Sequence, residues 1–228
     1  MNDQHWGPSI SADIVVIGGG TAGIGFVASL LKRDPDLKIT VIEPSSQHYY
    51  QPAWTLVGGG AYDAKDTARP MAKVMPRQVN WLQAAVSGID PDKRQLTLND
   101  QRTVSYQNLI VCPGLRLAWE KIEGLQESLG QHGVTSNYSY QHAQYTWDQV
   151  QKLRGGKALF TQPAMPIKCA GAPQKALYLS CDHWLKSGVL NNINVEFNLA
   201  GAALFGVATF VPPLMKYIEK YNAQLAFN

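Results

Sequence analysis

One stretch decides the fold of this chain: Asp13-Ile14-Val15-Val16-Ile17-Gly18-Gly19-Gly20-Thr21-Ala22-Gly23. Its first five residues form a short apolar run rich in β-branched side chains, which predicts a buried parallel strand. A glycine-rich turn follows, then residues 24–32 predict a helix and residues 38–42 a second strand that ends at Glu43. Strand, turn, helix and strand together have the length of one βαβ unit.

The glycines fit a dinucleotide-binding fingerprint, Gly18-x-Gly20-x-x-Gly23. In such a turn the first glycine permits the tight bend, the second lets a pyrophosphate approach the backbone, and the third lets helix and strand pack closely. The pyrophosphate then lies at the helix N-terminus, where free N–H groups and the dipole favour an anion. Glu43 is placed to accept hydrogen bonds from ribose hydroxyls. The alternative is a glycine-rich turn without a ligand, and the fingerprint alone does not separate FAD from NAD.

The remainder of the chain predicts a second, similar unit. Residues 44–76 are expected to be irregular, residues 80–89 and 95–98 to pair as antiparallel strands, and residues 108–112 to form a buried strand. A second strand–loop–helix pattern then covers residues 158–186, followed by a strand at 193–198 and a helix at 213–221. The fold class is therefore α/β, with two Rossmann-like units, at residues 1–118 and 119–228.

Composition excludes several classes. Of 228 residues, 45% are hydrophobic and 16% charged, which is ordinary globular composition, and a net charge of +3 is too small to indicate a nucleic-acid partner. The three cysteines show no zinc-ligand or disulfide spacing. Residues 1–12 lack the apolar core of a signal peptide, and no apolar run is long enough to span a membrane.

A reactive thiol is the chemical feature of the second unit. Cys169 lies in a Pro- and Gly-rich loop between a predicted strand and a predicted helix, which is where ligands bind in open α/β sheets. Lys168 beside it and the helix beginning near Pro173 would both favour the thiolate, the nucleophilic form. The alternative is a small buried hydrophobe, and that interpretation is favoured for Cys112 and Cys181.

Two longer motifs resemble a known family. The segments 48–58, His-Tyr-Tyr-Gln-Pro-Ala-Trp-Thr-Leu-Val-Gly, and 166–175, Pro-Ile-Lys-Cys-Ala-Gly-Ala-Pro-Gln-Lys, resemble the flavin-proximal segment and the cysteine motif of sulfide:quinone oxidoreductases, in particular the branch with the mitochondrial enzyme. Shorter likenesses at residues 136–139 and 204–207 extend the resemblance over nearly the whole chain from Asp13.

The resemblance implies an FAD/NAD(P)-binding Rossmann-like flavoprotein fold and names the residues of its sites. Cys169 matches one of two redox cysteines, and the residues expected to contact FAD are Gly18, Gly20, Thr21, Ala22, Gly23, Glu43, Gln51, Pro52, Trp54, Val86, Pro113 and Gly114. Sulfide, a quinone and a small sulfur acceptor are the implied partners. A peripheral membrane position is implied too, at the cytoplasmic face of a bacterial inner membrane, and a homo-oligomer stays open.

Departures from the family leave alternatives. The resembled enzymes are longer, and this sequence lacks their returning FAD segment, their second redox cysteine and their C-terminal membrane-contacting helices, so the FAD unit is expected to stay unclosed. An inactive nucleotide-binding fragment is therefore one alternative. A related FAD-dependent disulfide or NADH reductase is another, but residues 161–171 hold no second Gly-x-Gly-x-x-Gly.

Overall fold

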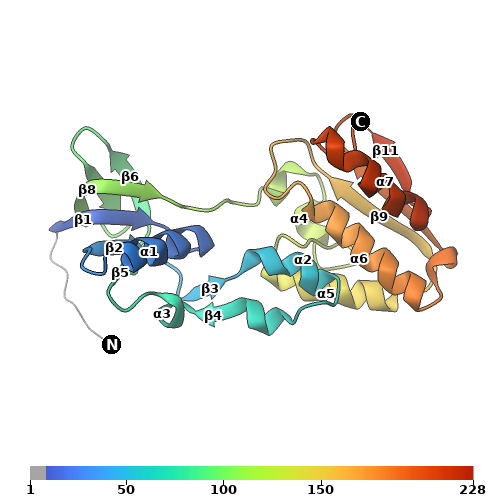
Figure 1. Ribbon diagram of the computed structural model, residues 1–228, viewed down its shortest axis with the longest axis horizontal. Helices are drawn as coiled ribbons and strands as arrows, with labels where there is room; N and C mark the ends of the chain where they lie inside the picture. Colours follow the sequence, from blue (N-terminus) through green and yellow to red (C-terminus); the bar gives the residue numbers. More distant parts are fainter. Residues whose placement is uncertain (1–8, 228) are drawn as a thin grey trace. The chain divides into compact units, whose positions relative to one another are not determined.

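The computed structural model describes residues 9–227, which form two compact units, each with its own β-sheet (Figure 1). The first unit contains the chain up to Tyr50 and Ala68–Arg116, and the second contains Gln51–Thr67 and Leu117 onward. The expected boundary at residue 118 lies close to the later crossing, but the excursion of residues 51–67 into the second unit was not expected. The part of residues 1–12 before Ser9, on which the signal-peptide prediction partly rests, lies outside the described residues.

The first unit contains a six-stranded sheet with the order β5-β2-β1-β8-β7-β6. Its strands are β1 Ser9–Ile17, β2 Ile39–Ile42, β5 Asn80–Leu82, β6 Val86–Asp90, β7 Gln95–Leu98 and β8 Thr103–Val111. The first four in sheet order run parallel, whereas β7 and β6 add an antiparallel edge. The predicted βαβ unit is confirmed, with a longer first strand and a helix α1, Thr21–Arg33, that begins directly after the glycine turn.

Alternation of side chains along β1 divides the core of this unit between the two faces of the sheet. Val16 packs with Val27 and Leu31 of α1, whereas its neighbour Val15 belongs to the cluster on the opposite face, with Leu96. All four residues of β2 are buried, as expected for a strand covered on both faces.

Two expectations for residues 44–98 were wrong, the first of them in part. Residues 80–89 do not form one strand, because β5 pairs in parallel with β2. The expected antiparallel pairing with residues 95–98 is confirmed for β6, which pairs with β7 at the opposite edge of the sheet. Residues 44–76 are not irregular either. They contain the antiparallel pair β3 Gln47–Tyr49 and β4 Ala68–Pro70, the helices α2 Trp54–Gly58 and α3 Met71–Val74, and the 3₁₀ turns η1 Gln51–Ala53 and η2 Ala64–Thr67.

The second unit contains a three-stranded parallel sheet with the order β11-β10-β9. Its strands are β9 Gly156–Gln162, β10 Ile193–Leu199 and β11 Gln224–Phe227, and its helices are α4 Leu125–Ser128, α5 Tyr140–Lys152, α6 Ala172–Lys186 and α7 Val211–Lys220. Short 3₁₀ turns lie at Trp119–Lys121, Leu190–Asn192 and Ala208–Phe210. The predicted strands and helices of this half are confirmed, whereas α5 and β11 were not foreseen.

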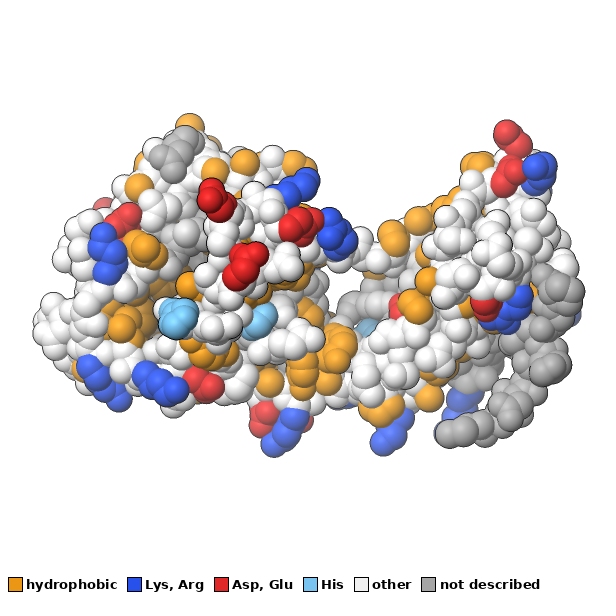
Figure 2. Space-filling view, turned by 180° about the vertical axis from the view of Figure 1, so that it is seen from behind, with side chains coloured by type: hydrophobic (Ala, Val, Ile, Leu, Met, Phe, Trp, Pro, Cys, Tyr) orange, Lys and Arg blue, Asp and Glu red, His pale blue; other side chains and the backbone are white. Residues whose placement is uncertain are grey.

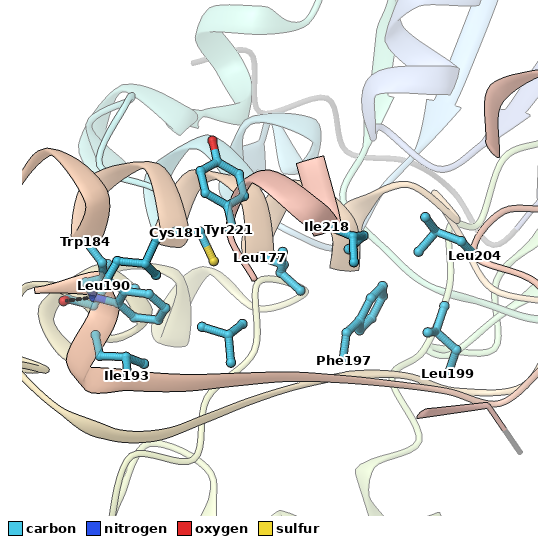
Figure 3. Packing of buried hydrophobic residues seen from close by; sticks show 12 residues of the cluster. Leu177, Cys181, Trp184, Leu190, Ile193, Phe197, Leu199, Leu204, Ile218 and Tyr221 are labelled. Carbon is cyan, nitrogen blue, oxygen red and sulfur yellow. Dashed lines mark hydrogen bonds between the residues drawn. The ribbon is translucent and has the colours of Figure 1, made fainter. Parts of the chain in front are cut away.

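Figure 3 shows the core of the second unit, in which side chains of α6 and α7 face those of β10. Phe197 of β10 and Leu177 of α6 are fully buried. The indole N–H of Trp184 donates to the Val150 carbonyl oxygen at 2.8 Å, which joins α6 to the end of α5 and satisfies a buried polar group. The base of the cysteine loop, between β9 and α6, is therefore anchored on a packed core.

Candidate functional sites: a glycine cradle and a thiol pocket

The three fingerprint glycines of the first unit have different surroundings. Gly18 has φ +99°, and a Cβ there would lie 2.0 Å from the Cys112 carbonyl oxygen. A Cβ on Gly23 would lie 1.9 Å from the Gly18 carbonyl oxygen. Around Gly20, in contrast, a Cβ would meet no atom within 4 Å. Gly23 thus lets α1 pack against the turn, Gly18 lets the turn approach the residue after β8, and Gly20 leaves open space above the turn, as a pyrophosphate requires.

The N-terminus of α1 opens into that space. Gly20 is its N-cap residue, the first turn carries no acidic side chain, and no side chain caps it. Among residues 9–227, the N–H groups of Thr21 and Ala22 have no recorded acceptor. A 13-residue helix with free first-turn N–H groups attracts an anion. Residues 18–23, with the open N-terminus of α1, form a glycine cradle that fits the diphosphate of a dinucleotide.

Glu43, at the end of β2, lies beside the glycine turn as predicted. One carboxylate oxygen accepts from the Gly19 N–H at 2.8 Å and the other from the Ser45 N–H at 2.7 Å. Two N–H donors leave further lone pairs on the carboxylate, so ribose hydroxyls can still be bound. His48 also reaches this turn, with its Nδ1 donating to the Gly19 carbonyl oxygen at 3.1 Å.

The other residues of the first unit expected to contact FAD lie at the ends of strands. Cys112-Pro113-Gly114 follows β8, where the Cys112 N–H donates to the Ile17 carbonyl oxygen at 2.8 Å and Gly114 has φ +73°. These residues therefore border the glycine turn. Val86 begins the edge strand β6 opposite Leu98, and its expected contact with an adenine stays a prediction.

Cys169 is the exposed thiol of the second unit, so the alternative of a small buried hydrophobe is wrong for this residue. It lies in the loop after β9, at the carboxyl end of that strand, and has φ +59°, in the left-handed region that non-glycine residues rarely adopt. Its carbonyl oxygen accepts from the Ala172 N–H at 2.8 Å, at the start of α6. The loop thus places the thiol near the N-terminus of a 15-residue helix, as predicted.

A small pocket brings Cys169 together with part of the predicted flavin-proximal segment. Its lining residues are Gln51, Pro52, Thr55, Asn137, Tyr138, Lys168, Cys169, Ala172 and Lys175. Two lysines at a pocket favour the approach of anionic reactants. Sequence reasoning identified Gln51, Pro52, Lys168 and Cys169 but missed Tyr138 and Lys175, although both lie within segments that carry the family resemblance.

Tyr138 contacts the main chain of the cysteine loop. Its hydroxyl donates to the Lys168 carbonyl oxygen at 2.7 Å and lies 3.4 Å from that of Cys169. Burial, and to a lesser extent the charge of Cys169, raises the pKa of the Tyr138 hydroxyl above its usual value of 10.0. The hydroxyl therefore stays protonated, and remains a donor, throughout the neutral range.

Glycines 58–60 attach the segment that carries Gln51 and Pro52 to this unit. A Cβ on Gly58 would lie 2.1 Å from the Asn137 side-chain oxygen, one on Gly59 2.5 Å from Leu179, and one on Gly60 2.4 Å from Trp147. Such close approach is available only to glycine. Helix α2 therefore packs directly on α5 and α6, and it keeps Gln51 and Pro52 at the thiol pocket.

Trp54 lies in the interior of the second unit. It is 8% exposed, packs with Val57 and Ala143, and donates its indole N–H to the Thr67 hydroxyl at 3.2 Å. These contacts are those of a core residue, and the expected contact with the flavin stays a prediction.

The other two cysteines have separate environments. Cys181 is fully buried in α6, as predicted, and burial raises the pKa of its thiol to about 12. Cys112 is half-buried. Cys181 is therefore an inert core side chain at neutral pH.

The described part of the chain lacks two further kinds of site. Residues 9–227 contain no group of three or more His, Cys, Asp or Glu side chains that could hold a metal ion. Within the same range, no helix has both the length and the apolar character needed to cross a bilayer. On the face shown in Figure 2, basic and acidic side chains are interspersed, in keeping with the small net charge.

Comparison with known proteins places these sites in a family. The family model described as pyridine nucleotide-disulphide oxidoreductase matches residues 12–157. The chain belongs to this family. The match contains the glycine cradle, Glu43 and the segment with Gln51 and Pro52, and it stops before the cysteine loop. The α/β, Rossmann-like fold class and membership in an oxidoreductase family are thereby confirmed.

Individual relatives agree with the resemblance seen in the motifs. The chain is 40% identical over 217 residues to the mitochondrial sulfide:quinone oxidoreductase of Dictyostelium discoideum and 36% identical over 215 residues to that of Mus musculus. Both alignments cover 94% of this chain but 48% of the relative, so the chain spans about half the length of these curated relatives. The solved sulfide:quinone oxidoreductase of Aquifex aeolicus matches 95% of this chain and 51% of its own with a TM-score of 0.76 at 22% identity, which supports the fold.

Proposed function

We propose that this chain provides the FAD cradle and a redox thiol of a sulfide:quinone oxidoreductase. The carrying observation is the thiol pocket: Cys169 is exposed at the carboxyl end of β9, in one pocket with Gln51, Pro52 and two lysines. The 40% and 36% identical relatives carry that activity in their names.

The glycine cradle would hold the diphosphate of FAD. Gly18 and Gly23 keep the turn tight, Gly20 leaves room for the phosphates, and the first-turn N–H groups of α1 donate to them. Glu43 would orient the adenosine ribose through its remaining lone pairs. When bound, FAD supplies a two-electron carrier between the sulfur and quinone half-reactions.

Cys169 would be the residue on which sulfide sulfur is oxidised, with bound FAD supplying the acceptor for the two electrons. When a sulfide sulfur bonds to the Cys169 sulfur, the two sulfur atoms together lose two electrons, two protons are released, and a persulfide remains on Cys169. A small acceptor thiol then takes the outer sulfur and restores the Cys169 thiol by thiol exchange. In the net reaction, sulfide, the acceptor thiol and a quinone give an acceptor persulfide and a hydroquinone, so hydrogens and electrons balance.

Lys168 and Lys175 would attract the anionic reactants of this reaction, because both residues line the pocket. A quinone partner further implies attachment to the surface of the membrane that holds the quinone, which the family resemblance also predicts. The cytoplasmic face of a bacterial inner membrane is our proposal for that surface.

A disulfide or NADH reductase is the second candidate, because the matched family includes pyridine nucleotide enzymes. It is disfavoured because the loop after β9, where a second dinucleotide fingerprint would lie, carries a thiol and two prolines and no Gly-x-Gly-x-x-Gly. An inactive nucleotide-binding fragment is the third candidate, and the exposed thiol among lysines speaks against it.

A flavin-reduction assay tests the proposal. The purified chain is loaded with FAD, mixed with sulfide under argon, and followed by the loss of the oxidised flavin absorption. Cys169→Ser should keep the bound FAD and lose sulfide-dependent reduction, whereas Cys112→Ser should keep both. Sulfide oxidation retained in Cys169→Ser would remove this thiol from the mechanism, and a wild-type chain that takes up no FAD would support the inactive fragment.

A further inference from the structure

The backbone at Cys169 needs an external support. Its φ of +59° lies in a region that costs a non-glycine residue free energy, and the loop between β9 and α6 has no regular structure over residues 163–171. A conformation of this kind persists only when neighbouring groups hold it.

Few hydrogen bonds hold the main chain of this loop. Among the described residues, the recorded hydrogen bonds to the main chain of residues 163–169 come from the Ala172 N–H, to the Cys169 carbonyl oxygen, and from the Tyr138 hydroxyl, to the carbonyl oxygens of Lys168 and Cys169. The first is local to the loop. Tyr138 is thirty residues away in sequence, so its hydroxyl is the tertiary anchor of the loop.

Tyr138 is itself fixed in place. Its N–H donates to the Ser136 hydroxyl at 3.1 Å, and the residue lies directly before Ser139, the N-cap of α5. The preceding residue, Asn137, is in close contact with Gly58 of α2. The anchor therefore belongs to the same packed body as α2 and α5, and its half-buried hydroxyl is protonated at neutral pH.

We infer that Tyr138 is a positioning residue, whose hydroxyl clamps the main chain at Lys168 and Cys169 and thereby orients the thiol in its pocket. The inference rests on the proposed function where it concerns catalysis, but the clamp itself does not depend on sulfide chemistry. Tyr138 acts through the loop backbone, so it is not assigned a proton-transfer role.

The first test measures the clamp directly, by hydrogen exchange and mass spectrometry on the full chain. Tyr138→Phe removes the hydroxyl and keeps the ring. Exchange of the amides of residues 163–172 should then rise about tenfold, as expected when a hydrogen bond worth about 1.4 kcal/mol is lost. Exchange of the amides in α5, α6 and β10 should stay unchanged. If Tyr138 only stabilised the second unit in general, exchange in these elements would rise as well.

Tyr178→Phe is the matched control. The Tyr178 hydroxyl is also half-buried and also contacts a backbone carbonyl oxygen, that of Leu214, at 3.3 Å. This variant should leave exchange of the cysteine loop unchanged. Unchanged loop exchange in Tyr138→Phe, or an equal rise in Tyr178→Phe, would overturn the clamp.

The second test links the clamp to the thiol. In the FAD-loaded protein, Tyr138→Phe should lower the limiting rate of sulfide-dependent flavin reduction about tenfold, with little change in the half-saturating sulfide concentration. Faster loop exchange with an undiminished limiting rate would refute the positioning role. If the wild-type chain binds FAD but shows no reduction by sulfide, the proposed function fails, and the exchange experiment alone decides the clamp.

Discussion

Replacing Gly20 by valine tests nucleotide binding at the glycine turn with little effect on the stability of the fold. Gly20 has φ −70° and ψ −176°, which any residue can adopt, and a Cβ there meets nothing within 4 Å. The free energy of unfolding should therefore change by less than about 1 kcal/mol, because the lower entropy of the unfolded chain and the poorer N-cap residue act in opposite directions. Gly23→Ala is the contrasting variant, because its Cβ would lie 1.9 Å from the Gly18 carbonyl oxygen. It should cost at least about 3 kcal/mol.

Gly20→Val should weaken FAD binding strongly, although it leaves the stability of the fold nearly unchanged. A valine side chain at Gly20 would occupy the space above the turn and keep the FAD phosphates from the first-turn N–H groups of α1. Loss of two charge-assisted hydrogen bonds at about 1.5 kcal/mol each amounts to about 3 kcal/mol, or a rise in Kd of more than about a hundredfold. Urea unfolding measures the stability term and titration of flavin fluorescence measures Kd. An unchanged Kd in a folded Gly20→Val protein would refute the assignment of the cradle.

Two further predictions concern the second unit. Because burial raises the pKa of Cys181 to about 12, above its ordinary value of 9.0, the folded state binds a proton that the unfolded chain releases first. The resulting contribution to the free energy of unfolding is complete below pH 9 and is lost as pH rises towards 12, with a slope of up to about 1.4 kcal/mol per pH unit. Denaturant unfolding at pH 8 and pH 10 should therefore show a smaller loss of stability between the two pH values in Cys181→Ala than in wild type. Gly60→Ala should lower the free energy of unfolding by more than about 2 kcal/mol, because φ is +71° and its Cβ would lie 2.4 Å from Trp147. Gly188→Ala has the same backbone strain at φ +72° with nothing within 4 Å, so a cost equal to that of Gly60→Ala would contradict the role of the clash.

Local patterns predicted the glycine cradle because its requirements are local. The β-branched run of β1, the glycine spacing and the acid at the end of β2 are each visible within thirty residues, and the structure brings them together. The break between β5 and β6 was missed because both segments alternate in polarity, whereas their separation to opposite edges depends on which neighbours they pair with.

Several features of the thiol site could not be predicted from local sequence patterns, because they depend on residues far apart in the sequence. Helix α5 is polar overall and buries Ala143, Thr146 and Val150 on one face, a pattern that its aromatic residues obscured. The triple glycine at 58–60 indicated an irregular segment, because its closeness to Leu179 and Trp147 involves partners about ninety to one hundred and twenty residues away. Exposure of Cys169 likewise depends on the tertiary structure, because the sequence left a buried thiol as the alternative, whereas the burial of Cys181 was predicted.

The excursion of residues 51–67 has a practical consequence for dissecting this protein. These residues connect β3 to β4, a paired ribbon of the first unit, yet they belong to the second. A single cut near residue 117 therefore yields no independent halves: the downstream piece would lose α2 and expose Trp147 and Leu179, and the upstream piece would carry a helix without its partners. Independent expression would need the second unit supplied with residues 51–67 through an engineered linker, and the first unit with a short turn in their place.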